Sequence, residues 1–213
     1  MNILVIAAHP DDEVLGMGAT IKKLSKNFKV DLCVVSEGAS AQYSDSKMMD
    51  FRKQSCIKSG KILGISNFYF LEFPDMKLDS IPQIEITKKL ESILKKKKYS
   101  VIYTTPSNDL NKDHSIVYES TMIAARPSRN KVEKIFSYEI PGHILTPFVP
   151  NVYENIFKEF SFKKKAFEKY SSEIEEFPNP RSFEVLESLA KLRGMESGFK
   201  KAESFQLIRS ISI

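Results

Sequence analysis

One histidine and three carboxylates stand within five residues of this chain, in the segment His9-Pro10-Asp11-Asp12-Glu13. They follow an apolar run, residues 3–6, which is typical of a buried strand. Pro10 ends that strand because it cannot donate to a strand ladder. Ligands of open α/β sheets bind at the carboxyl ends of the strands. Carboxylates this close repel one another, so a folded site needs a positive partner, and a divalent metal ion is the first candidate.

A second loop with the same chemistry covers residues 107–114 and follows another expected strand, residues 101–105. It contains Asp109 and His114, and it ends at a helix start for which Asp113 is the predicted N-cap. If the two strands are parallel, both loops lie at one edge of the sheet. His9, Asp12 and His114 then form a site of nitrogen and oxygen ligands with an open fourth position, the pattern of a catalytic zinc.

Spacing alone leaves open which of Asp11, Asp12 and Glu13 binds the ion. Neighbouring residues on a turn diverge, whereas His9 and Asp12, three residues apart, can converge on one ion. Asp11 would then lie beside the metal, free to act as a general base. The alternative is that the first motif is only a cap or a turn, and that His114 is a helix N-terminal residue without a ligand role.

Alternating strand and helix patterns position these two loops. Strands are expected at residues 3–7, 30–35, 68–73, 101–105 and 134–140, and helices at 13–24, 46–63, 81–95, 114–125, 153–170 and 183–193. Regular alternation predicts an α/β fold with a mostly parallel sheet flanked by helices, closed by two C-terminal helices. No linker or repeat divides the chain, so residues 1–213 are expected to form a single domain.

Composition excludes several classes of partner. The formal net charge is +5 with a pI of about 9.0, and much of the excess is lysine at residues 95–98 and 163–165. Both lysine runs are predicted to be solvated helix ends. Arginine and aromatic residues are not interleaved on a recognisable module, so no nucleic-acid partner is expected. Attraction to an anionic substrate, or to a membrane carrying a lipid-linked one, is the weaker alternative.

Membrane insertion and secretion are also not expected. No apolar run approaches the ~18 residues that span a bilayer. The N-terminal apolar run has no basic stretch before it and breaks at His9, so it is predicted to be a strand and not a signal peptide. Cys33 and Cys56 lack metal-type spacing, which favours a reduced, cytoplasmic compartment.

Two segments carry a family resemblance. Residues 8–13, Ala-His-Pro-Asp-Asp-Glu, resemble the first motif of the LmbE-like, PIG-L-type N-deacetylase family, and residues 109–114 resemble its second motif. Further pieces fit in order along nearly the whole chain: Ser36-Glu37-Gly38, Arg52, Arg193-Gly194, Gly198 and residues 202–205.

This resemblance implies a Rossmann-like fold, one Zn²⁺ ion and hydrolysis of an N-acetyl group. The implied substrate is a small-molecule or lipid-linked sugar of the N-acetylglucosamine type, with surface polysaccharide or glycoconjugate biosynthesis as one setting. The implied roles are metal ligation by His9, Asp12 and His114, and proton transfer by Asp11. Substrate contact is assigned to Arg52, Asn111 and Asp109.

One position departs from the family pattern: Asn111 stands where many relatives carry histidine. An amide can donate a hydrogen bond but cannot transfer a proton. His143, the third histidine, follows the expected fifth strand and is predicted to replace the missing one as a catalytic acid or donor. The alternative is a surface loop histidine.

Other functions stay open at this point: a zinc amidohydrolase for a non-sugar amide, or a non-catalytic sugar-binding relative. A nucleotide-binding protein is disfavoured because residues 16–18, Gly-Met-Gly, lack the GxGxxG pattern. The oligomeric state, a homo-oligomer included, is also open.

Overall fold

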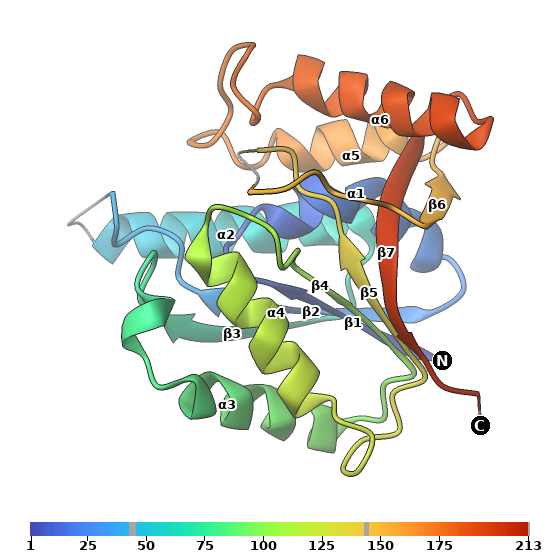
Figure 1. The fold of residues 1–213 in the computed structure, drawn as a ribbon. Coiled ribbons are helices and arrows are strands. Elements are labelled where there is room, and N and C mark those ends of the chain that lie inside the picture. The colour runs from blue at the N-terminus through green and yellow to red at the C-terminus, as the bar shows by residue number, and fades with distance from the viewer. Residues whose placement is uncertain (43–45, 143–144, 213) are drawn as a thin grey trace.

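A seven-stranded sheet between two layers of helices organises the computed structural model, which describes residues 1–42, 46–142 and 145–212 (Figure 1). In sheet order the strands are β3 (Asn67–Phe73), β2 (Lys29–Ser36), β1 (Asn2–Ala7), β4 (Val101–Thr104), β5 (Lys134–Tyr138), β7 (Ala202–Ser210) and β6 (Val152–Asn155). The first five strands of this order pair in parallel, whereas β7 runs antiparallel to both β5 and β6. The predicted α/β fold with a mostly parallel sheet is confirmed.

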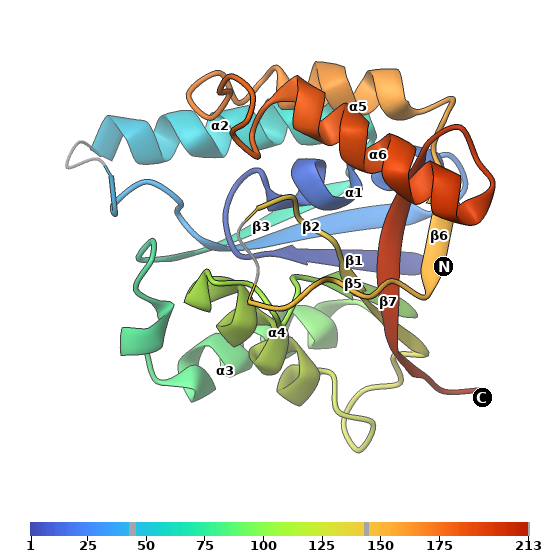
Figure 2. The same cartoon turned by 45° about the horizontal axis from the view of Figure 1, so that its top comes forward.

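The helices divide between the two faces of the sheet (Figures 1 and 2). One face carries α1 (Asp12–Leu24), α2 (Ser46–Leu63), α5 (Phe160–Phe167) and α6 (Phe183–Ser197); the other carries α3 (Gln83–Lys96) and α4 (Lys112–Ala124). A short 3₁₀ helix, η1 (Leu78–Ser80), precedes α3. In the described part of the chain, no helix has both the length and the apolar character needed to cross a membrane.

Strand β1 shows why the sheet is buried on both sides. Ile3, Val5 and Ala7 belong to the hydrophobic core under α1 and α2, whereas Leu4, Ile6 and Ala8 belong to the core under α3 and α4. Side chains alternate between the faces of a strand, so a continuous apolar run is what a strand covered on both faces requires.

The C-terminal third differs from the prediction. A helix was expected at residues 153–170, and this is wrong: the segment contains strand β6 and the short helix α5. Strand β7 was not predicted at all, and β6 pairs with it over Val152–Asn155. The two strands are distant in sequence and stabilise each other by pairing, which local periodicity does not reveal.

Parallel pairing brings the two motif loops to one edge. Strand β1 pairs with β4 from Ile3↔Val101 to Val5↔Tyr103, so residues 8–11 and 105–111 both leave the sheet at its carboxyl edge. Strands β2 and β3 pair in the same direction and bring residues 37–42 and 74–76 to that edge as well. The common edge on which the predicted metal site depends is therefore present.

Candidate metal centre

Three ligand atoms converge where the two motif loops meet. His114 Nε2 lies 3.3 Å from His9 Nδ1 and 3.4 Å from Asp12 Oδ1, whereas His9 Nδ1 lies 3.5 Å from the other carboxylate oxygen, Asp12 Oδ2. One ligand atom from each of the three residues lies within 4.8 Å of the other two. All three side chains are buried. A tetrahedral ion with bonds of about 2.0–2.1 Å needs ligand atoms about 3.4 Å apart. These residues therefore have the chemistry of three metal ligands, and the His9–His114 and His114–Asp12 separations are close to that value. We call His9, Asp12 and His114 the metal cluster.

Backbone N–H groups just after β1 fix the orientation of Asp12. Its Oδ2 accepts the backbone N–H groups of Ala8 and His9, at 3.0 and 2.8 Å. The carboxylate thus closes the turn between β1 and α1. These bonds occupy Oδ2, and Oδ1 is left facing His114. A capping interaction of this kind ties the ligand geometry to the end of the strand.

Both histidines of the metal cluster are held from behind by carboxylates. His114 Nδ1 lies 2.7 Å from Asp109 Oδ2, and His9 Nε2 lies 3.1 Å from Asp113 Oδ2 and 3.3 Å from Asp75 Oδ1. Carboxylates behind a metal-ligating histidine fix its tautomer and ring orientation. His9, Asp75 and Asp113 could themselves surround an ion. However, Asp113 already accepts the N–H groups of Met76 and Leu78, which favours the orienting role.

Acidic surroundings dominate the electrostatics of the metal cluster. Burial by itself lowers the pKa of His9, but hydrogen bonds to Asp113 and Asp12 outweigh it and raise that pKa to about 10. Burial likewise opposes the charged form of His114, yet the charge of Asp12 and the bond to Asp109 raise its pKa to about 9. The carboxylates around the cluster therefore favour positive charge at the position where a cation would bind.

Asp11 is buried beside the metal cluster in an unusual backbone conformation. Its φ is 130°, in the region that residues other than glycine rarely adopt, and its side chain is fully buried. Oδ2 is 3.1 Å from Arg181 Nε, whereas Oδ1 has no hydrogen-bond partner within the described residues. Burial raises the pKa of this carboxyl, and the charges of Arg181 and Arg52 partly oppose the increase.

Glu13 is turned away from the metal cluster. Its carboxylate accepts the Tyr170 hydroxyl and, at 3.2 Å, the backbone N–H of Asp11. Burial raises the pKa of Glu13 to about 8. Of the three adjacent acids, Asp12 is the one whose carboxylate lies with His9 and His114 in a group that could hold a metal ion.

Arg52 is buried and largely committed to the protein. Its Nη1 pairs with Glu173 Oε1 at 2.5 Å, and its Nη2 donates to the Pro10 carbonyl at 2.7 Å. Nη2 also lies 3.6 Å from Asp11 Oδ2, and Nε has no partner among the residues described. Arg52 therefore connects α2, the first motif and the segment that follows α5.

Two hollows flank the metal cluster. One, of about 440 Å³, is lined by Asp12, His114, Asp109 and a largely apolar wall that includes Leu15 and Ile140. The other, of about 480 Å³, is lined by polar side chains on the His9 side: Gln42, Arg52, Asp75 and Glu173. Met76, Asn111 and Arg181 line both hollows. A substrate bound at the metal cluster would therefore contact an apolar wall on one side and a polar wall on the other.

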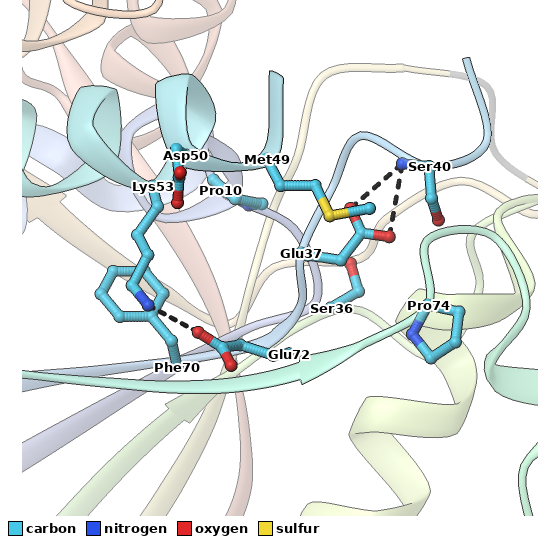
Figure 3. A pocket seen from close by; sticks show the side chains of 10 residues that line it. All are labelled: Pro10, Ser36, Glu37, Ser40, Met49, Asp50, Lys53, Phe70, Glu72 and Pro74. Atoms are coloured by element: carbon cyan, nitrogen blue, oxygen red, sulfur yellow. Dashed lines mark hydrogen bonds and ion pairs between the residues drawn. The ribbon is translucent and has the colours of Figure 1, made fainter. Parts of the chain in front are cut away.

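A third hollow, of about 530 Å³, is lined by residues that lie next to those of the polar hollow in the sequence (Figure 3). Pro10, Glu37, Ser40 and Pro74 line it, whereas their chain neighbours His9, Gly38, Ala41 and Asp75 line the polar hollow. Three loops thus form a wall between the two spaces. The Glu37 carboxylate accepts the N–H groups of Ala39, Ser40 and Asp75, and Lys53 reaches Glu72 beside Phe70. This hollow holds none of the cluster residues.

The second motif differs in one detail from the prediction. Asp113 was expected to cap α4, and this is wrong: the helix begins two residues earlier than expected, at Lys112, and Asn111 is the N-cap. Asn111 Oδ1 accepts the N–H of Asp113 at 3.0 Å. The Asp113 carboxylate is thereby free to turn towards His9. His143 lies outside the described residues.

Three residues of the site were not assigned from the sequence. Asp75 follows β3 at the same sheet edge, so the rule that located the first motif could have found it. Glu173 and Arg181 belong to the segment between α5 and α6. No strand-end pattern marks them, because their position depends on how that segment packs back over the first motif.

Fold and metal cluster together define an α/β protein with a candidate catalytic metal centre at its sheet edge. A family model described as PIG-L, GlcNAc-PI de-N-acetylase, matches residues 4–125, more than half of the chain. The chain is also 31% identical over 178 residues to the uncharacterized deacetylase YaiS of Escherichia coli (strain K12). The matched region covers 80% of this chain and 91% of that protein. The chain therefore belongs to the PIG-L family and is a deacetylase, a hydrolase of amide bonds.

Solved structures agree on the fold. N,N′-diacetylchitobiose deacetylase from Pyrococcus horikoshii superposes with a TM-score of 0.81 at 23% identity, over 97% of this chain and 83% of that one. GalB, the 4-carboxy-2-hydroxymuconate hydratase from Pseudomonas putida KT2440, gives 0.82 at 17% identity, over 100% and 98%. Because a hydratase shares the fold, fold alone does not decide the reaction.

Proposed function

We propose that this chain is a zinc-dependent N-deacetylase that removes the acetyl group from an N-acetylated sugar or sugar conjugate of the N-acetylglucosamine type. The observation that carries the proposal is the metal cluster: His114 Nε2 lies 3.3 Å from His9 Nδ1 and 3.4 Å from Asp12 Oδ1, and one ligand atom from each residue lies within 4.8 Å of the other two. Two nitrogen ligands and one oxygen ligand leave a fourth position for water or substrate.

Zinc fits this donor set better than magnesium or calcium, which favour oxygen ligands alone. His9, Asp12 and His114 would hold the ion, with Asp109, Asp75 and Asp113 orienting the two rings. When bound, a zinc ion supplies Lewis acidity, lowering the pKa of water towards neutrality and polarising a carbonyl group.

Asp11 is the proposed proton carrier. Its Oδ1 is buried and lacks a partner among the described residues, so it is free to accept a proton from the attacking water. The water oxygen bonds to the acetyl carbon, and the carbon–nitrogen bond then breaks. Asp11 returns the proton to the leaving amine, so the products are acetic acid and a free amine. At neutral pH the acid passes its proton to the amine, which gives acetate and an ammonium group. No group outside the site is needed to balance this step.

Asn111 is the proposed donor to the substrate carbonyl. Its Oδ1 is fixed by the N-cap bond, which leaves the Nδ2 group available, and the residue lines both hollows. Arg52 lines the polar hollow, where it would contact substrate. Asp109 lines the apolar hollow, yet its bond to His114 supports an orienting role beside any contact with substrate. His143 remains a proposed acid or donor.

A sugar substrate is supported by the family description, a GlcNAc-PI de-N-acetylase, and by the diacetylchitobiose deacetylase among the structural relatives. The polar hollow offers carboxylates, an amide and guanidinium groups, which suit hydroxyl groups. Cys33 and Cys56 are free and buried, as a reducing compartment such as the cytoplasm permits.

Acetate release tests the proposal. The protein would be stripped with a chelator, reloaded with zinc, and assayed on N-acetylglucosamine, diacetylchitobiose, a nucleotide sugar, an N-acetylglucosaminyl phosphoinositide and an N-acetyl amino acid. We expect zinc-restored release from at least one sugar and little from the amino acid. Release only from the amino acid would favour an amidohydrolase for non-sugar amides. No release, with sugar binding retained, would favour a non-catalytic sugar-binding protein.

A further inference from the structure

Arg181 reaches the first motif from a distant part of the chain. It lies in the segment between α5 and α6, outside the residues 4–125 that match the family model. Its Nε lies 3.1 Å from Asp11 Oδ2 and 3.9 Å from Glu173 Oε2. The side chain is 40% exposed and lines both hollows beside the metal cluster. It therefore connects the fully buried Asp11 carboxylate to the wall of the space that a substrate would fill.

The two oxygens of Asp11 have different surroundings. Oδ2 accepts the Arg181 bond, whereas Oδ1 is buried and has no hydrogen-bond partner in the part of the chain that the structure describes. A carboxylate can rotate about its Cβ–Cγ bond and exchange its oxygens. A hydrogen bond to one oxygen fixes that rotation and assigns a different role to each oxygen.

We propose that Arg181 is a positioning residue that holds Asp11 Oδ2, so that Oδ1 stays free and correctly aimed for proton transfer. This inference rests on the proposed deacetylase function of the same site. It adds to that site a residue from the C-terminal third.

Arg52 cannot replace Arg181 in this role. Its Nη2 lies 3.6 Å from Asp11 Oδ2, beyond a hydrogen bond, and already donates to the Pro10 carbonyl at 2.7 Å. Its Nη1 pairs with Glu173. Arg181, in contrast, makes the direct bond to Asp11.

The backbone around Arg181 supports a fixed position. Its N–H donates to Asn179 Oδ1 at 2.9 Å, and its carbonyl accepts the N–H of Glu175 at 3.2 Å. The next residue, Ser182, is the N-cap of α6 and bonds the N–H of Val185. A side chain whose backbone is held by hydrogen bonds can keep a carboxylate within the narrow range of positions that proton transfer needs.

Replacement of Arg181 by alanine tests the inference. We expect R181A to keep its zinc and to lose ~10- to 100-fold in kcat, the usual cost of misplacing a reacting group. KM should change much less, because the substrate-binding groups remain. Added guanidinium ion should restore part of the kcat of R181A, and R181K should retain more activity than R181A. A merely structural role predicts none of this rescue.

Arg126 provides the matched control. Its side chain is 34% exposed and pairs with Glu91 at 2.9 Å, at the other end of α4 from the metal cluster. R126A should leave kcat and KM unchanged. Equal losses of kcat in R126A and R181A would overturn the inference, as would loss of zinc in R181A alone.

A double-mutant cycle with Asp11 closes the test. If Arg181 acts through Asp11, R181A should cost kcat nothing further in a D11N background. The same cycle on urea unfolding of the metal-free proteins should show non-additive midpoints, a readout that needs no activity. Additive effects in both cycles would overturn the inference. An inactive wild-type protein would contradict the proposed function alone, because the unfolding cycle still measures the Arg181–Asp11 coupling.

Discussion

Two buried groups of charged side chains lie along α1, and they differ in how many of their polar atoms have a hydrogen-bond or ion-pair partner. The Lys163–Glu203 pair sits beside a kink at Met17, where φ is −144° and ψ is 25°. Lys163 Nζ donates to the Leu15 carbonyl at 2.8 Å and to Glu203 Oε1 at 2.7 Å. The Glu203 carboxylate accepts the N–H groups of Ala19 and Thr20, at 3.1 and 2.7 Å.

The metal cluster at the start of α1 is not self-contained in this way. Carboxylates surround its two histidines, and Asp11 Oδ1 lacks a partner among the described residues. In the Lys163–Glu203 pair, one cation faces one anion. Their other polar atoms form hydrogen bonds with backbone groups next to the kink. A buried group whose polar atoms are all paired is typical of a structural role. A buried group with excess negative charge and an unpaired acceptor atom is typical of a ligand site.

Removing the histidines of the metal cluster should have the largest effect. The double variant H9A/H114A leaves one of the three ligands, so we expect zinc to be lost and acetate release to fall below detection. Metal analysis of the purified protein and an acetate assay measure both. Full zinc occupancy in the double variant would show that the ion, if any, binds elsewhere, and the contrast between the two charge groups would fail.

Asp11→Asn should leave the metal and remove the proton acceptor. The amide is nearly the same size and tolerates the positive φ of 130°. We expect zinc to be retained and kcat to fall ~10²-fold or more, the usual contribution of a general base. Asp79→Asn, at a half-exposed position in η1, is the control and should match the wild type. Zinc lost from D11N but kept in D12N would reverse the assignment of the two carboxylates.

The sequence predicted that the two motif loops meet at one edge of the sheet, because the residues that mark each strand end are neighbours in the sequence. An apolar run, Pro10 and a cluster of acids mark a strand end, and parallel strands share an edge. Beyond residue 150 the same reasoning predicted helix α6 but missed β6 and β7, because β7 pairs with β5 and β6, which lie far from it in the sequence. Lys163 is the clearest case: it was predicted to be solvated with its neighbours, and this is wrong, because its side chain is 4% exposed.

Asp109→Asn should weaken zinc binding more than it changes chemistry. Asp109 Oδ2 lies 2.7 Å from His114 Nδ1, and loss of such a partner costs about 10–100-fold in metal affinity. We expect a weaker zinc affinity in a chelator competition, with kcat largely restored at saturating zinc. If zinc affinity is unchanged and KM rises instead, Asp109 acts on substrate, as the family resemblance implies.

Lys163→Ala should affect stability and leave the chemistry alone. Removing the lysine leaves the buried Glu203 carboxylate without its cation, and breaking one side of a buried ion pair costs about 3–5 kcal/mol. Urea unfolding measures this loss, and Lys165→Ala, two residues along on the exposed side of α5, should stay within about 0.5 kcal/mol of the wild type.

The paired change Lys163→Met with Glu203→Gln completes this test. It removes both charges, so it should cost less than Lys163→Ala alone, although the N–H groups of Ala19 and Thr20 keep only one amide oxygen as acceptor. Zinc content and kcat per folded molecule should match the wild type in all three variants. If Lys163→Ala instead lowered kcat with an unchanged unfolding midpoint, the Lys163–Glu203 pair would belong to the working site, and the distinction between the two charge groups along α1 would not hold.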